Sequence, residues 1–142
     1  MFTAFPLLII PVLLYNLFAL TEVVGSKAQS AGQDLRSTLF PVGMPGARTW
    51  DVASGDLFLA LGLVMLFFEL IKATKTDKVA IINHSLSMIL FIFCLVEFIL
   101  APGFATSVFF LLMMMTFLDV LAGFIVTIVA ARRDFDIGGG SH

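Results

Sequence analysis

The stretch TSVFFLLMMMTFLDVLAGFIVTIVAA, residues 106–131, decides the class of this protein. A helix needs about 20 mostly apolar residues to cross a hydrocarbon core of about 30 Å. This run is long enough and contains one ionisable residue, Asp119. Three more apolar runs precede it, at about residues 2–24, 52–71 and 79–100. We therefore predict an all-α membrane protein in which residues 1–137 form a single four-transmembrane-helix bundle.

The composition of the whole chain agrees with a membrane location. Hydrophobic residues make up 60% of the sequence and charged residues 13%, against roughly 45 to 50% and about 25% in soluble domains. The net charge is −2, and the few basic residues form no broad face for nucleic acid. The lipid bilayer is the expected surrounding, and nucleic acid is excluded as a partner.

The connections between the apolar runs predict an orientation. Basic residues are more numerous on the side of the two termini (Lys72, Lys75, Lys78, Arg132, Arg133) than on the opposite side (Lys27, Arg36, Arg48). Because cytoplasmic loops carry the excess of Lys and Arg, we expect a multi-pass protein of the bacterial inner membrane with both termini cytoplasmic. The outer loop, residues 25–51, is expected to be a partly ordered cap, with Trp50 as an interfacial anchor where the second span starts. Residues 138–142, GGGSH, are expected to be a flexible tail.

Asp119 is the strongest candidate for a functional group, since it lies near the middle of its span. Thr116 shares its helix face. The short connection at residues 101–104 predicts that the last two spans are antiparallel neighbours, which brings Asn83, His84 and Ser87 close to Asp119. These five residues form a predicted intramembrane polar site. Asp119 is either a proton site or a structural clamp that bonds to Ser87, Asn83 or a backbone group.

A second polar group is predicted toward the outer side. Tyr15 and Asn16 in the first run, Asp56 in the second and Glu97 in the third are placed to form an outer polar cluster. Glu69, close to Lys72 at the inner boundary, is interpreted as an interfacial charge.

The sequence offers little for catalysis. Cys94 is the single cysteine, so there is no CxxC pair and no thiolate zinc site. The motifs of zinc proteases, phosphate loops and nucleophile elbows are also absent from the sequence. We expect no enzyme activity, metal or cofactor. Whether lipid, quinone or pigment covers the many phenylalanines is left open.

Two functions remain after these exclusions. The first is an accessory or assembly subunit of a membrane complex, or a self-associating bundle, with a membrane protein partner or a second copy. The alternative is a small oligomeric proton-coupled transporter or channel that uses Asp119.

Overall fold

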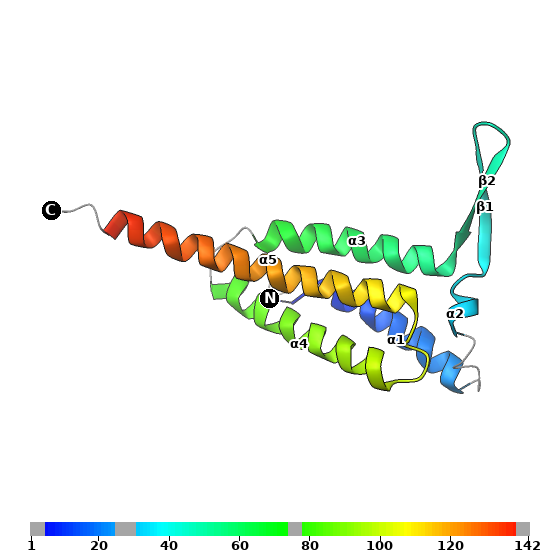
Figure 1. The fold of residues 1–142 in the computed structure, drawn as a ribbon, viewed down its shortest axis with the longest axis horizontal. Coiled ribbons are helices and arrows are strands. Elements are labelled where there is room, and N and C mark those ends of the chain that lie inside the picture. The colour runs from blue at the N-terminus through cyan, green and yellow to red at the C-terminus, as the bar shows by residue number, and fades with distance from the viewer. Residues whose placement is uncertain (1–4, 25–30, 74–77, 139–142) are drawn as a thin grey trace.

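The computed structural model describes residues 5–24, 31–73 and 78–138. Within these residues the chain forms five helices and two strands (Figure 1). In chain order they are α1 (Ile9–Val24), α2 (Ala31–Asp34), β1 (Thr38–Met44), β2 (Arg48–Ala53), α3 (Ser54–Ala73), α4 (Lys78–Leu100) and α5 (Ser107–Gly138).

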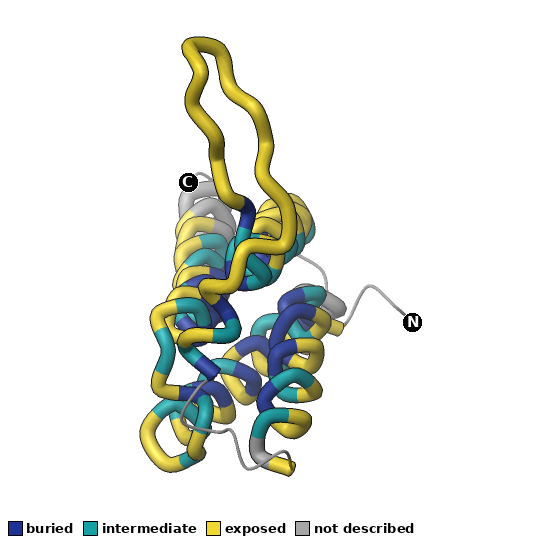
Figure 2. Tube along the Cα trace, turned by 90° about the vertical axis from the view of Figure 1, so that its right-hand side faces the viewer, coloured by how far each residue is buried: buried dark blue, intermediate teal, exposed yellow. Residues whose placement is uncertain are grey.

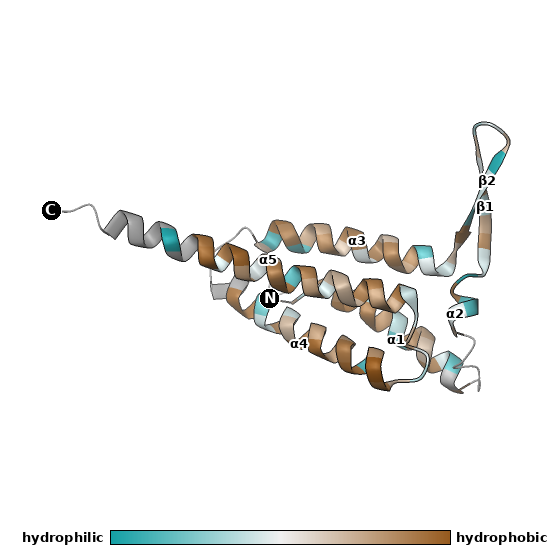
Figure 3. Ribbon diagram, viewed as in Figure 1, coloured by the Kyte–Doolittle hydropathy of each residue, from teal (hydrophilic) through white to brown (hydrophobic). Residues whose placement is uncertain are grey.

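Three of these helices are long and apolar enough to cross a membrane. The apolar segments are Ser54–Ala73 in α3, Ile81–Leu100 in α4 and Ser107–Val129 in α5, and hydrophobic residues dominate all three (Figure 3). Helix α1 has 16 residues, which corresponds to about 24 Å at about 1.5 Å per residue. The described residues thus provide three helices of spanning length. A crossing by the predicted first span stays a prediction, and residues 1–4 of that span lie outside the described part.

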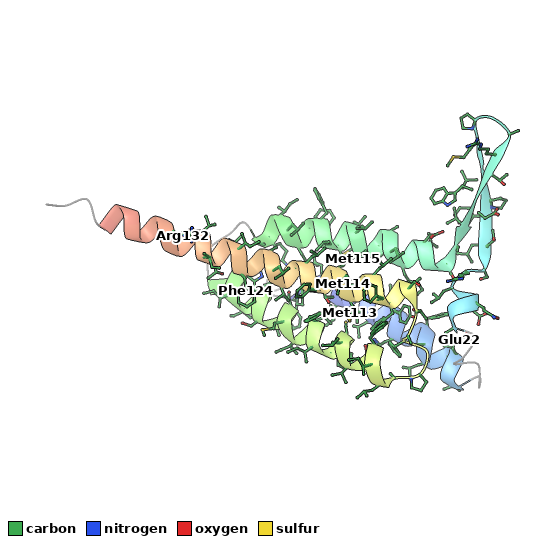
Figure 4. The ribbon with its side chains drawn as sticks, in the orientation of Figure 1. Glu22, Met113, Met114, Met115, Phe124 and Arg132 are labelled. Atoms are coloured by element: carbon green, nitrogen blue, oxygen red, sulfur yellow. The ribbon has the colours of Figure 1, made fainter. Side chains whose placement is uncertain are left out.

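Helix α5 is the centre of the helical body. It lies between α3 and α4 and packs against both, while α1 packs on α3 and α5 (Figure 1). Helices α4 and α5 are antiparallel neighbours joined by a short connection, which confirms that predicted pairing. Past its apolar segment, α5 continues beyond the end of the other helices, and Arg132 lies on this extension (Figure 4).

Aromatic packing closes the end of the body where α4 joins α5. Tyr15 of α1 is fully buried, and its ring centroid lies 5.6 Å from that of Phe104 and 4.8 Å from that of Phe109. Its hydroxyl lies 2.5 Å from the Thr106 hydroxyl and donates to the Gly103 carbonyl at 3.2 Å. These contacts fix α1 against the connection between α4 and α5.

The all-α prediction is wrong in the connection between α1 and α3. Strands β1 and β2 form an antiparallel hairpin there. Its turn contains Gly46 and Ala47, with φ of 89° and 57°. The hairpin stands clear of the helical body and is exposed along almost its whole length (Figure 2). The sequence pattern of two prolines and two glycines is typical of a loop, which is why the strands were not predicted.

The rest of that connection contacts the helices. Ala31 and Leu35 are buried, and the Leu35 carbonyl accepts a hydrogen bond from the Gly55 amide at 2.9 Å. Trp50, which was expected where the second span starts, lies instead in β2, because α3 begins at Ser54. Residues 25–30 of the predicted outer loop lie outside the described part.

Candidate functional site

Glu69 lies in the last turns of α3, and it is fully buried. Its carboxylate accepts hydrogen bonds from three donors on three parts of the chain. These are the Leu7 amide at the start of α1, the Lys72 Nζ at 2.9 Å and the Asn83 Nδ2 of α4 at 2.9 Å. Glu69 therefore links α1 and α4 to α3. The interpretation of Glu69 as an interfacial charge is wrong.

Lys72 completes this group and balances its charge. Its Nζ lies 2.9 Å from Glu69 Oε1, and it also donates to the Phe5 carbonyl at 2.8 Å and to Asn83 Oδ1 at 3.2 Å. Leu7 and Phe5 lie just before α1, where backbone N–H groups have no acceptor within the helix, and the Glu69 and Lys72 side chains bond to this segment. We call Glu69, Lys72 and Asn83 the clamp.

Asp119 lies about 18 Å along α5 from the first residue of that helix, at about 1.5 Å per residue. It is fully buried. Neither of its carboxyl oxygens has a hydrogen-bond partner among the described residues. Glu69, Lys72 and His84 lie close enough to act on Asp119 electrostatically. Asp119 is thus a buried acid beside a clamp whose own charges are already paired.

The two hydroxyls near Asp119, those of Ser87 and Thr116, donate hydrogen bonds to backbone carbonyls. Ser87 lies next to the Asp119 carboxyl but donates to the Asn83 carbonyl at 3.1 Å. Thr116 donates to the Met113 carbonyl at 2.7 Å. A hydroxyl has one proton, which can rotate between acceptors, so Ser87 is the neighbouring donor that could turn from the Asn83 carbonyl to the Asp119 carboxyl. The Asp119 oxygens form no hydrogen bond to Ser87 or Asn83 in this arrangement, and whether Asp119 is a structural clamp or a proton site stays a prediction.

His84 faces Asp119's helix from α4. Its Nδ1 is buried and has no hydrogen-bond partner in the described part of the chain. The ring packs directly on Gly123 of α5, where a Cβ atom would lie 2.2 Å from Nδ1. Only glycine permits this contact, so Gly123 is a determinant of the site. Gly123 lies four residues after Asp119 and therefore on the same face of α5, but its contact with His84 was not predicted.

A surface groove between α4 and α5 adjoins His84. It has a volume of about 350 Å³. Its lining is mostly apolar with three polar side chains, and consists of Ile81, His84, Ser85, Met88, Val120, Gly123, Phe124 and Thr127. Phe124 stands on its α5 side (Figure 4). The groove therefore brings a ligand or a neighbouring helix within reach of the His84 ring.

The structure brings together two of the four residues of the predicted outer polar cluster. Asn16 Nδ2 donates to Glu97 Oε2 at 3.2 Å and also to the Val12 carbonyl at 3.1 Å. Tyr15 instead bonds to the connection between α4 and α5. Asp56 accepts from the Ala53 amide at 2.9 Å, which caps the start of α3.

Of the predicted intramembrane site, Asn83 belongs to the clamp, while His84 and Ser87 lie at Asp119. Glu69 and Lys72 were not predicted to belong to it. Their spacing of three residues places them on one helix face, which was the available signal. Among the described residues, no group of three or more His, Cys, Asp or Glu side chains is placed to hold a metal ion.

The fold and the site together define a small, mostly helical protein with three helices long and apolar enough to cross a membrane, and with a buried polar site shared by α3, α4 and α5. No protein-family model, curated protein or solved structure matches the chain. Its function has to be inferred from the geometry of the polar site.

Proposed function

We propose that this chain is a non-enzymatic, proton-coupled membrane protein that works as an oligomer, with Asp119 as the group that takes up and releases the proton. The observation that carries the proposal is the burial of Asp119 with both carboxyl oxygens unpaired. An ionised carboxylate without partners is so costly in an apolar surrounding that such a group holds a proton or a counter-ion instead. Intramembrane acids of this kind mark proton and ion pathways.

The neighbours of Asp119 support proton exchange. Lys72 is engaged by Glu69 at 2.9 Å and is therefore a poor permanent counter-ion for Asp119. His84 has a buried ring nitrogen without a hydrogen-bond partner among the described residues, so an imidazole nitrogen is available near Asp119 as a donor or acceptor. Asp119 and His84 thus form a pair through which a proton can be passed, and we call them the proton pair.

An oligomer is part of the proposal because one copy provides few helices. In the described part of the chain, the groove beside His84 opens on the outer surface of α4 and α5 and does not run through the body. A second copy seated on this surface would turn the groove into an enclosed path. Four helices or fewer leave little room for a path of their own.

Proton movement in proteoliposomes tests the proposal. Vesicles containing a trapped pH-sensitive dye are subjected to a pH step, with the wild type compared with Asp119→Asn. We expect the variant to assemble normally and to lose the protein-dependent proton flux. Glu97→Gln is the matched control, since it removes a membrane acid that is bonded to Asn16. Equal flux in the wild type and Asp119→Asn would contradict the proposal.

An accessory subunit is the second candidate, and the groove between α4 and α5 favours it. Ser85 and Thr127 already donate to backbone carbonyls, so His84 is the polar group that a lipid chain would leave without a partner. A partner helix with a polar side chain could bond to it. Native mass measurement in mild detergent separates the two candidates. A stoichiometric foreign protein that is released by filling the groove, as with Ser85→Leu, supports the accessory role. A closed homo-oligomer supports the proton-coupled role.

The membrane orientation is also a proposal. The distribution of Lys and Arg favours both termini in the cytoplasm of a bacterial cell, although Lys27 and Lys75 lie outside the described residues. Reporter fusions test this directly. A reporter in the β1–β2 turn should be active outside, and one after Ala73 should be active inside.

A further inference from the structure

The β1–β2 hairpin is the largest feature that the polar site does not use. It projects away from the helical body, across the direction in which the helices run, from the end where α3 begins (Figures 1 and 2). It contains two strands, and in the described part of the chain no third element covers it. A lone two-stranded hairpin is marginally stable in water. To keep this shape, the hairpin therefore needs a further surface to pack against.

The strand register sorts the hairpin into two different faces. Phe40 pairs with Val52, and Val42 pairs with Trp50. Directly paired residues lie on the same side of a sheet, and the side alternates along each strand. One face therefore carries Phe40, Val42, Met44, Trp50 and Val52, with Arg48 at the tip. We call it the apolar face.

The opposite face is small and polar. It carries the pair Pro41 and Asp51 and the pair Gly43 and Thr49. The apolar face is largely uncovered: Phe40 is 49% exposed and Trp50 is 50% exposed. The hairpin is thus amphipathic, with its hydrophobic side unused in a single copy of the chain.

Val52 fixes the direction in which the apolar face turns. It is 5% exposed at the base of the hairpin, where it packs against the helical body. Phe40 and Trp50 share its face, so they continue the same side outward, past the edge of the body. The apolar spanning segment of α3 starts two residues after Val52. The apolar face and the lipid-contacting sides of the helices are therefore continuous.

We propose that the hairpin lies flat on the membrane, with its apolar face in the interfacial layer of the bilayer. A hairpin that runs across the direction of membrane-crossing helices can lie along the membrane surface. Trp and aromatic rings favour the level of the lipid headgroups, and Arg48 at the tip can bind a lipid phosphate. Asp51, on the opposite face, then faces water. This proposal is independent of the proton pair.

Fluorescence of Trp50 tests the proposal without a label, because the chain contains one tryptophan. The protein is placed in vesicles of phosphatidylcholine whose acyl chains carry bromine either near the headgroup or near the chain end. We expect strong quenching by shallow bromine, weak quenching by deep bromine and little quenching by iodide in the water.

Two single-tryptophan variants serve as references, one for a tryptophan in water and one for a tryptophan in the lipid chains. The double variant Trp50→Phe with Asp51→Trp moves the tryptophan to the other face of the same strand, and iodide should quench it several-fold more than lipid bromine does. The double variant Trp50→Phe with Leu63→Trp places it on the exposed surface of α3, where deep bromine should quench best.

Two outcomes would overturn the proposal. If iodide quenches Trp50 as strongly as it quenches the tryptophan moved to position 51, the apolar face is in water. If neither iodide nor lipid bromine reaches Trp50, a protein covers the face, either a second copy or a foreign partner. If Trp50 stays shielded from lipid at every protein concentration in a dilution series, the protein that covers the apolar face is a permanently bound subunit.

Discussion

Glu69 and Asp119 are both fully buried acids in the same helical body, yet their surroundings are opposite. Glu69 accepts hydrogen bonds from three donors and pairs with Lys72. Asp119 has no hydrogen-bond partner among the described residues. A buried acid whose bonds are all made stabilises the helices that supply the donors. A buried acid whose oxygens form no bonds gives the helices no such stabilisation, and burial disfavours its charged form.

This difference separates a structural role from a functional one. Removing Glu69 leaves several buried donors without an acceptor, whereas removing Asp119 leaves none. Stability measurements on matched variants therefore distinguish the two acids. Each variant is unfolded by adding a denaturing detergent to protein in mild detergent, with helix content as the readout.

The largest effect is expected for Glu69→Leu. The substitution leaves the Lys72 ammonium, the Asn83 amide and the Leu7 amide without their common acceptor. Breaking a buried ion pair from one side costs about 3 to 5 kcal/mol, and we expect a loss of that size together with release of α1. Glu69→Gln, which keeps one acceptor oxygen, should lose less. Wild-type stability in Glu69→Leu would show that the clamp does not hold the helices together.

The next effect concerns the contact between His84 and Gly123. In Gly123→Ala the new methyl group would lie 2.2 Å from the His84 ring, and a ring cannot bend away as a flexible chain can. Forcing an extra methyl group into a packed site costs about 1 to 3 kcal/mol. We expect destabilisation in this range and recovery when His84→Ala is added.

Gly62→Ala is the matched control for that experiment. Its methyl group would meet the ends of the Leu112 and Met115 side chains at 2.8 Å, and both side chains are flexible enough to shift. Both glycine variants gain the same helix propensity, about 1 kcal/mol. The difference between them therefore measures the clash with His84. Equal stability in the two variants would mean that His84 does not pack on Gly123.

The sequence predicted much of the helical pairing. The four-residue connection at residues 101–104 placed α4 against α5 in the correct register, because antiparallel neighbours at equal depth have position numbers with a constant sum. His84 accordingly meets Gly123. The polar and small residues Asn83, Ser87 and Cys94 recur on one face of α4, and all three are buried. The pairing of Asn16 with Glu97 followed from their similar depth.

The clamp could not be predicted for a physical reason. Glu69 lies one turn from the end of its helix and beside a lysine, and both features are typical of a solvated charge. Its burial depends on the Leu7 amide, which lies 62 residues away along the chain, and on Asn83. Backbone donors at the start of a helix carry no side-chain signal, so the acceptor that caps them is invisible in the sequence.

The hairpin was missed for a different reason. Pro41, Gly43 and Gly46 weaken the strand pattern, and an isolated hairpin has no third strand to strengthen it. The alternation of Phe40, Val42 and Met44 was the available signal of a strand, since these residues share one face. The turn also contains Ala47 at a positive φ of 57°, where a non-glycine residue is uncommon.

The smallest effect is expected for Asp119→Asn. Because no donor of the described residues bonds to Asp119, we expect the free energy of unfolding to stay within about 1 kcal/mol of the wild type. The matched variant Glu69→Gln should be clearly less stable, since Lys72 loses its counter-charge. A loss in Asp119→Asn as large as that in Glu69→Gln would place Asp119 in the structural framework.

Carboxyl infrared spectroscopy tests the central claim most directly, namely that Asp119 binds the proton. Spectra of the protein in vesicles are recorded from about pH 5 to about pH 9, a range in which ordinary surface carboxyls stay ionised. We predict a protonated-carboxyl band that is lost as the pH rises, that is absent in Asp119→Asn and that persists in Glu97→Gln. A wild-type spectrum without any Asp119-dependent protonation band across this range would contradict the claim.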